Sequence, residues 1–309
     1  MKLSHLRDTL AVAELGSLRA AGRQLGVAQP AISRSIRELE HELGVALFER
    51  HAKGVRLTDM GRAFVGRAES VQSELRRAVE EIEQLKGRAT GEVSVAMSTA
   101  ASMTLMPKSV TEFRKRYPDA LLKIHESFFA PIERELLSGH IDFYVGPFES
   151  GHSRRFVVEK LYETRRMVVA RRGHRLADAR TLADVGDAHW IRPALSGRTT
   201  EGDFDRMFVM AGLPPPRIVV HARSALITML TVVNSDLLTV LPKQWIDFPL
   251  AAALVAPLKI EPVGAAPMCL VRRPDMPLTP MAEHLCDQVR RTATQHAQAL
   301  SMSDADHAA

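Results

Sequence analysis

Residues 17–50 read SLRAAGRQLGVAQPAISRSIRELEHELGVALFER, and this stretch decides the fold of the N-terminal part of the chain. Its second half places apolar side chains at alternating steps of four and three residues, which is the spacing of one buried helix face. That face is expected to consist of Ile32, Ile36, Leu39 and Leu43. Pro30 suits the first turn of this helix, where its missing N–H has no helical partner to lose.

A shorter helix is predicted just before it. Ser17 can cap its start, Leu18, Ala21 and Leu25 give it an apolar face, and Gly26 supplies the turn that follows. Two short helices joined by such a turn, the second showing polar and basic side chains, are typical of a helix-turn-helix. In that second helix, Gln29 suits adenine and Arg34 suits guanine. A small helical bundle with solvated arginines is the alternative.

The flanking segments favour the helix-turn-helix. Upstream, a further helix is expected to bury Leu3, Leu6, Leu10 and Ala13 and to end at Gly16. Downstream, ERHAKGVRLT at 49–58 predicts a short hairpin that bends at Gly54 and carries basic side chains. A basic wing beside a recognition helix can follow phosphates or enter the minor groove of DNA.

Residues 17–50, with RLTDMGRAF at 56–64, resemble the winged helix-turn-helix of the LysR-type transcriptional regulators. The resemblance implies that Gln29, Pro30, Ser33 and Arg34 read bases and that Arg50, Lys53 and Arg56 form the wing contacts. Ser17, Arg19 and Arg37 complete the expected DNA-binding residues. Ala28 departs from the family, which usually has a hydroxyl residue there to cap the recognition helix. The missing cap is expected to cost about 1 kcal/mol unless another group replaces it.

Charge is concentrated at the N-terminus. The chain has a net charge of +5, and residues 1–67 hold eleven Lys and Arg against seven Asp and Glu. A polyanion is therefore the expected partner of that end. The N-terminus has no apolar signal segment, so we expect a cytoplasmic protein without a membrane partner. Cys269 and Cys286 fit neither a disulfide framework nor a metal site, and we interpret them as buried or idle thiols.

A long linker helix is predicted after the wing, with Thr58 and Asp59 at its start. Its apolar residues recur at alternating steps of four and three and form a seam of Phe64, Ala68, Val71, Leu75, Ala78, Ile82 and Leu85. A helix from Thr58 to Leu85 is about 40 Å long, so this narrow seam needs a partner. A second copy would make a homodimer with two recognition helices. Packing against the chain's own C-terminal domain is the alternative.

From Glu92 onward, strand and helix patterns alternate, which predicts a mostly parallel sheet covered by helices on both sides. The strand APMCLVRR and a helix from Pro280 to Leu300 are expected to return to the first of two lobes, and SMSDADHAA at the C-terminus is expected to be disordered. The expected domains are 1–58 (winged helix-turn-helix), 59–90 (linker and hinge) and 91–309 (effector binding). Lobe I spans roughly 91–163 and 266–300, and lobe II roughly 164–265.

Ligands of open α/β sheets bind beyond the carboxyl ends of the strands, where helices begin. The residues at those places are Ser98, Thr99, Glu126, Ser127, Gly146, Pro147, Arg192, Ser196, Arg223 and Ser224. Hydroxyls, helix ends and two arginines favour a small anion such as a carboxylate or sulfonate. Taken singly, most of the hydroxyls are better explained as helix caps.

The resemblance extends to the LysR effector domain, whose two lobes are similar to type II periplasmic binding proteins. It implies that Ser98, Thr99 and Ser224 hold an effector, and NSDLLTVLP at 234–242 is loosely similar to regulators of aromatic acid or sulfonate catabolism. Glu126 is an exception beside an anion site: it would repel an anion, bind an amine-bearing effector, or pair with an arginine.

The sequence therefore predicts a DNA-binding transcriptional regulator controlled by a small anionic effector, and the loose similarity of residues 234–242 suggests an aromatic one. The resemblance implies a homotetramer and contact with RNA polymerase in addition to operator DNA. An enzyme or solute-binding α/β domain with an attached DNA-binding module is the alternative. Common catalytic motifs such as GxSxG, GxxxxGK[ST] and HExxH do not occur, so we expect no catalytic residues and no cofactor or metal.

Overall fold

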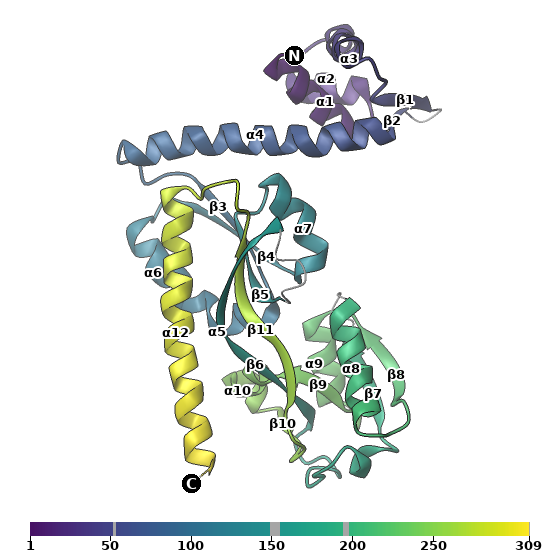
Figure 1. Cartoon of the computed structure of the whole chain (residues 1–309), viewed down its shortest axis with the longest axis vertical. Coiled ribbons are helices and arrows are strands. Elements are labelled where there is room, and N and C mark those ends of the chain that lie inside the picture. Colours follow the sequence, from purple (N-terminus) through teal and green to yellow (C-terminus); the bar gives the residue numbers. More distant parts are fainter. Residues whose placement is uncertain (52–53, 149–154, 194–197, 309) are drawn as a thin grey trace. The chain divides into compact units, whose positions relative to one another are not determined.

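The computed structural model describes residues 1–51, 54–148, 155–193 and 198–308 (Figure 1). The chain divides into two compact units: residues 1–86 with 137–140, and residues 87–136 with 141–309. None of the helices in these described ranges is long and apolar enough to cross a membrane.

The first unit has the predicted order of elements. Its helices and strands are α1 (Leu3–Leu15), α2 (Leu18–Leu25), α3 (Gln29–Leu43), β1 (Phe48–His51), β2 (Gly54–Leu57) and α4 (Asp59–Leu85). The predicted glycine ends are confirmed, because Gly16 and Gly26 adopt left-handed conformations with φ of 62° and 67°. Ser17 caps α2 as predicted, its hydroxyl accepting a hydrogen bond from the Ala20 amide at 3.3 Å.

The small core of this unit differs in part from the predicted one. Ile32, Ile36 and Leu39 are buried as expected, but Leu43, in the last turn of α3, is 40% exposed. In α1, Leu3 is 61% exposed, whereas the polar Thr9 is fully buried. The reason is that α1 is packed against α2, α3 and α4 at once, so its buried face is wider than a single apolar stripe.

Thr58 joins the wing to the long helix α4. Its amide donates to the Leu47 carbonyl at 3.0 Å, its hydroxyl donates to the Ala46 carbonyl at 2.7 Å, and the same hydroxyl oxygen accepts from the Gly61 amide at 2.9 Å. The predicted cap of α4 is therefore confirmed. Gly61 lies so close to the loop before the wing that a Cβ atom would come 2.0 Å from the Leu47 carbonyl oxygen.

The second unit is built on a sheet of seven strands, counted over the described residues. In spatial order these are β10 (Val255–Pro257), β6 (Val157–Arg171), β11 (Val263–Arg272), β5 (Phe143–Pro147), β3 (Glu92–Met97) and β4 (Leu121–Glu126), with β9 (Thr239–Pro242) also paired to β6. A separate parallel pair consists of β7 (His189–Pro193) and β8 (Arg217–Ala222).

The expectation of a mostly parallel sheet is wrong. In the seven-stranded sheet, as far as the described residues show, the pairs of β3 with β4 and of β3 with β5 are parallel, and the pairs made by β6 and β11 are antiparallel. Strand β6 is the reason, because its fifteen residues, VVEKLYETRRMVVAR, group charged and apolar side chains in pairs and short runs and lack the alternation that predicts a strand. The predicted return of APMCLVRR is confirmed, since β11 pairs with β5.

Strands β6 and β11 are also the connections between the two expected lobes. The lobe boundaries at 163–164 and 265–266 fall inside these strands. The β6–β11 ladder changes register between Ala265 and Met268 and again between Met268 and Cys269. The chain thus crosses between lobes as paired strands, with an irregular ladder next to the crossing.

Helices cover the sheet on both sides, with α6 and α12 together on one side and α7 on the other (Figure 1). The helices of this unit are α5 (Thr99–Thr104), α6 (Met106–Arg116), α7 (Phe129–Ser138), α8 (Arg198–Met210), α9 (Ala225–Val233), α10 (Lys243–Asp247), α11 (Pro249–Ala252) and α12 (Pro280–Ala308), with a 3-10 turn, η2, at Ala183–Val185. The expected disorder of SMSDADHAA is wrong for residues 301–308, which continue α12.

We expect Gly61→Ala to destabilise the protein by about 1–3 kcal/mol, because the added methyl group collides with backbone that cannot move without displacing the wing. Gly66→Ala is the matched control in the same helix, since no atom lies within 4 Å of its Cβ position. That change should stabilise by about 0.5–1 kcal/mol through helix propensity. Urea unfolding followed by circular dichroism measures both, and equal midpoints for the two variants would contradict the close approach.

Candidate functional site

Helix α3 presents a polar and basic surface opposite its buried face. Gln29, Pro30, Arg34 and Arg37 are exposed and Ser33 is half-buried. The Arg37 Nε atom donates to the Ser33 carbonyl at 3.2 Å, which holds that guanidinium along the helix. The structure therefore places all five predicted α3 residues on one accessible side of the N-terminal unit.

The structure shows how α3 begins without a hydroxyl cap. Ala28 is the N-cap residue, in extended conformation, and makes no side-chain hydrogen bond. Its carbonyl accepts from the Ala31 amide at 2.9 Å and from the Ile32 amide at 3.4 Å. Pro30 has no amide hydrogen, so the first turn has fewer donors to satisfy than an ordinary helix. The backbone thus compensates for part of the missing cap.

The acidic residues in the second half of α3 have structural partners. Glu40 accepts from the Leu47 and Phe48 amides at 2.7 and 3.1 Å and so fixes the loop before the wing. Glu38 lies 3.5 Å from His5 Nε2. The Met1 ammonium, 2.5 Å from Glu42, lowers the pKa of that carboxyl. These acids attach the far end of α3 to its neighbours.

The predicted wing is a hairpin whose register separates its two arginines. Arg50 is paired with Val55, and Arg56 with Glu49, so the two guanidinium groups leave opposite faces. The Val55 amide donates to the Gly16 carbonyl at 2.9 Å, which attaches the wing to the turn between α1 and α2. Both arginines are exposed. Lys53, the third predicted wing residue, lies outside the described residues.

Ser17 and Arg19, the remaining predicted DNA contacts, lie at the start of α2. Arg19 is exposed, whereas Ser17 is half-buried and its hydroxyl is used as the helix cap.

The predicted seam on α4 is apolar and exposed along most of its length. Val71, Leu75, Ile82 and Leu85 are 44 to 73% exposed, and Ala78 is exposed as well. The N-terminal part of the seam is different, because Ala68 is 2% exposed and Phe64 is half-buried. Ala68 is therefore already buried within its own chain, and the prediction that it contacts a second copy is wrong. Val79, 65% exposed, is an apolar side chain that the heptad count missed.

In the second unit, the structure brings the six predicted residues of lobe I to one edge of the sheet. Met97 pairs with Glu126 in β4 and with Val145 in β5, so the carboxyl ends of β3, β4 and β5 lie side by side. The Ser98 amide donates to the Val145 carbonyl at 2.9 Å, and the Ser127 amide to the Met97 carbonyl at 3.0 Å. The predicted edge residues are Ser98, Thr99, Glu126, Ser127, Gly146 and Pro147.

Several of these residues have local structural roles. Ser98 is 1% exposed and caps α5, accepting from the Ala101 amide at 3.3 Å. The Ser127 hydroxyl donates to the Phe128 carbonyl at 3.0 Å. A Cβ atom at Gly146 would lie 2.0 Å from the Tyr144 hydroxyl, so this glycine makes room for a buried ring. The cap interpretation therefore suits Ser98.

Glu126 is the charged member of this edge. Its carboxylate accepts a hydrogen bond from the Thr99 hydroxyl at 2.5 Å, and the side chain is exposed. Three roles were considered for Glu126, and among the described residues it does not pair with an arginine. The Glu126 carboxylate, which the Thr99 hydroxyl orients, can still accept hydrogen bonds from a ligand.

The predicted residues of lobe II also meet at one edge. Arg192 pairs with His221 across β7 and β8, which places Arg192 beside Arg223 and Ser224 at the carboxyl ends of these strands. Ser224 caps α9, accepting from the Ile227 amide at 3.5 Å. Ser196, also predicted here, lies outside the described residues.

The two arginines of lobe II differ in their surroundings. Arg192 forms an ion pair with Asp205, and its guanidinium carbon lies 5.4 Å from the centre of the Phe204 ring. Its side chain is only 17% exposed. Arg223 is exposed. Asp205 was missed from the sequence because an acidic residue on a helix gives no sign of its distant partner.

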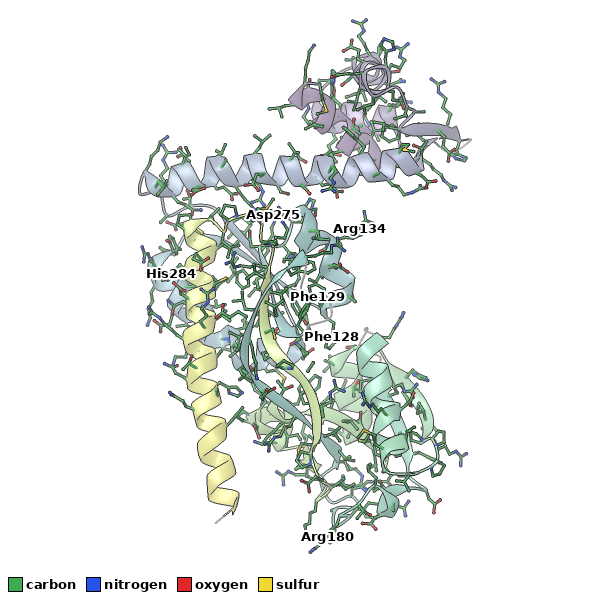
Figure 2. All side chains as sticks on the ribbon, in the orientation of Figure 1. Phe128, Phe129, Arg134, Arg180, Asp275 and His284 are labelled. Carbon is green, nitrogen blue, oxygen red and sulfur yellow. The ribbon has the colours of Figure 1, made fainter. Side chains whose placement is uncertain are left out.

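An aromatic cluster beside the lobe I edge was also missed. Phe128 and Phe129 follow the carboxyl end of β4 (Figure 2). The Phe129 ring packs edge-to-face against the rings of Tyr144, Phe148 and Phe156, with 4.6 to 5.6 Å between ring centroids. Two adjacent phenylalanines directly after a predicted strand are the sequence feature from which this cluster could have been predicted. These packed aromatic rings form an apolar layer next to the lobe I edge.

Comparisons with known protein families cover almost the whole chain. Residues 86–294 match the family described as "LysR substrate binding domain", and residues 3–62 match "Bacterial regulatory helix-turn-helix protein, lysR family". Over 313 residues the chain is 28% identical to the HTH-type transcriptional regulator GbpR of Azospirillum brasilense, covering 98% of this chain and 90% of GbpR. It is 33% identical to PcaQ of Agrobacterium fabrum over 177 residues, or 57% of each chain.

Solved structures share the fold. ArgP from Mycobacterium tuberculosis is similar with a TM-score of 0.70 and 20% identity, over 94% of this chain and 96% of that chain. Full-length CbnR complexed with its target DNA has a TM-score of 0.65 and 23% identity, over 94% of this chain and 100% of that chain.

We expect Ala28→Ser to stabilise the N-terminal unit by about 0.5–1 kcal/mol, because a hydroxyl at this extended position can accept from the Ala31 amide. The gain is at the low end for a cap because Pro30 has already removed one donor. Ala31→Ser, inside the first turn, is the control and should not stabilise. Thermal unfolding followed by circular dichroism measures both, and an unchanged or lower midpoint for Ala28→Ser would contradict this account of the cap.

Proposed function

Because this chain belongs to the LysR family of transcriptional regulators, we propose that α3 and the hairpin of β1 and β2 bind a DNA operator and that residues 91–309 bind a small effector. The chain is a DNA-binding regulator with an effector-binding domain. The observation that carries the proposed operator contacts is the accessible face of α3, where Gln29, Pro30, Ser33, Arg34 and Arg37 lie together.

Within that face, the proposed base contacts are those of the first two turns. An amide pairs well with adenine and a guanidinium with guanine in the major groove, so Gln29 and Arg34 are proposed to read bases. The exposed wing arginines leave opposite faces of the hairpin. Arg50 is then proposed to follow the phosphates, because Arg56 shares its face of the hairpin with Glu49, whose carboxylate repels phosphate.

The regulator is proposed to act as a homodimer through α4. The exposed apolar residues Val71, Leu75, Val79, Ile82 and Leu85 support a helical seam with a second copy. Two recognition helices on one rigid dimer bind a two-fold operator more tightly than either alone. A homotetramer and contact with RNA polymerase stay predictions from the family.

The effector is proposed to bind at the strand ends of the two lobes, without a cofactor or a metal. Thr99, Glu126 and Arg223 are polar groups there that are exposed or half-buried and whose side chains do not cap a helix. An effector changes the activity only if it prefers one arrangement of the protein over another.

We propose that the chain has no enzymatic activity. Ser94 and His125 lie together, with 3.2 Å between the hydroxyl oxygen and Nε2, but Ser94 is 3% exposed and a substrate cannot reach it. Burial raises the pKa of the Cys269 thiol to about 11 and that of Cys286 well above its usual value, which disfavours both as nucleophiles. These surroundings support a binding protein over the alternative of a catalytic domain.

We expect Arg34→Ala to weaken operator binding by about 1–3 kcal/mol and to relax specificity at one base step. Fluorescence anisotropy with an operator selected from random DNA by the parent protein measures the affinity, and single-base variants of that operator measure the specificity. Arg180→Ala, an exposed arginine of the second unit, is the control for the lost charge (Figure 2). If Arg34→Ala binds the operator as tightly as Arg180→Ala, α3 is not the reading helix in this orientation.

We expect Leu75→Glu to weaken the dimer by at least about tenfold, since it removes from both copies a leucine that the proposed dimer buries and brings two like charges together. Sedimentation velocity over a range of concentrations measures the dissociation constant. Leu250→Glu, the same change at an exposed leucine of α11, should leave the assembly unchanged. Sedimentation of Leu75→Glu as the parent assembly would overturn the proposed seam.

A further inference from the structure

The two sets of strand ends in the effector domain carry opposite charges. Glu126 is the single charged side chain among the six predicted residues of the lobe I edge. At the lobe II edge, the described predicted residues that carry charge are Arg192 and Arg223. What matters for a ligand is how much of this charge is already neutralised within the chain.

The Glu126 carboxylate is oriented but not neutralised. Among the described residues, its hydrogen-bond partner is the Thr99 hydroxyl at 2.5 Å. Lys123, on the same strand, pairs with Glu92 at 2.8 Å. His125 interacts with the Ser94 hydroxyl at 3.2 Å. The neighbouring basic side chains are thus occupied elsewhere, and Glu126 presents a negative charge at the edge.

Thr99 makes this carboxylate selective for a cation. A hydroxyl donates one proton, and that proton is used on Glu126, so the hydroxyl oxygen can only accept from a ligand. The two side chains together offer acceptors and a negative charge. An ammonium group, with three N–H donors and a positive charge, satisfies both, whereas an anionic group would be repelled.

The lobe II edge has the opposite character. Arg192 is neutralised by Asp205. Arg223 is exposed, and no ion pair or hydrogen bond of its side chain occurs among the described residues. It directly precedes Ser224, the cap of the nine-residue helix α9, whose N-terminus adds positive potential. A carboxylate is the group that this edge favours.

The two edges belong to one packed core. Ala222 and Ala225, on either side of Arg223 and Ser224, are packed in the same hydrophobic cluster as Met97 and Ala100, which flank Ser98 and Thr99. Both edges therefore border the same hydrophobic core, and the strand ends of open α/β sheets are where ligands of such domains bind.

We propose that the effector is a small zwitterion, an amino carboxylate such as an amino acid, whose ammonium group binds Glu126 and Thr99 and whose carboxylate binds Arg223 at the start of α9. This inference rests on the proposed effector function and names its ligand class. It also assigns a role to Glu126, the residue that did not suit a simple anion. The carboxylate expected from the sequence is one end of this ligand.

The first experiment is a thermal-shift and calorimetric screen of the full-length protein with the twenty standard amino acids, several simple carboxylates and several simple amines. At least one amino acid is expected to raise the melting temperature and to bind. Its N-acetyl derivative, which lacks the ammonium charge, and its C-terminal amide, which lacks the carboxylate, should each bind about 10- to 100-fold more weakly, as expected for a lost charge-assisted hydrogen bond.

Variants then assign each end of the ligand. Glu126→Gln keeps the shape of the side chain and should weaken the amino acid about 10- to 100-fold while leaving its N-acetyl derivative unchanged. Arg223→Gln should weaken the amino acid and leave its amide unchanged. Glu112→Gln, a half-buried acid on α6 that pairs with Lys115, is the control and should bind as the parent does.

Two results would overturn the inference. One is that no amino acid in the screen changes the melting temperature. The other is that a simple carboxylate binds more tightly than any amino acid and that Glu126→Gln tightens it further, which would identify an anionic effector. Operator binding of the unliganded protein is measured in parallel. If operator binding is retained, only the zwitterion is excluded; if the protein binds no selected DNA, the proposed function itself fails.

Discussion

Three hydrogen bonds of Thr58 hold together the loop before the wing, the end of the wing and the beginning of α4. The close approach of Gly61 to the Leu47 carbonyl adds a steric constraint at the same point. With the Gly16 carbonyl bound to the Val55 amide, and with Glu40 bound to two amides of the loop, the reading helix and the wing form one rigid piece with the first turns of α4. Any change in the direction of α4 is therefore passed directly to the reading surface.

Much of the first unit was predictable because its signals are local. Caps at Ser17 and Thr58, left-handed glycines and the apolar spacing of α3 act over a few residues. The errors occurred where packing partners come from elsewhere in the chain. Leu3 is exposed and Thr9 buried because three helices surround α1, and Ala68 is buried before any second copy arrives. Sequence spacing gives a face but does not say which neighbours cover it.

The second unit was predicted less well for the same physical reason. The strand ends of lobe I were placed correctly, because parallel β–α units bring those ends to one edge. Strand β6 escaped notice, and with it the antiparallel half of the sheet, since its charged and apolar residues are sorted by distant strand partners. The charges of the candidate site were equally hidden. Nothing in the spacing distinguishes Arg192, neutralised by Asp205, from Arg223, or shows that Glu126 is held by Thr99.

The paired strands β6 and β11 run from one expected lobe into the other. Flexible loops would let two lobes swing freely, but a hydrogen-bonded ribbon resists bending in its plane and yields more readily to torsion. A rotation of one lobe against the other must then be taken up as added or lost twist along this ribbon. The register changes around Met268 interrupt the ladder at the crossing, and the torsion is easiest there. The orientation of one lobe relative to the other is therefore tied to the twist of two paired strands.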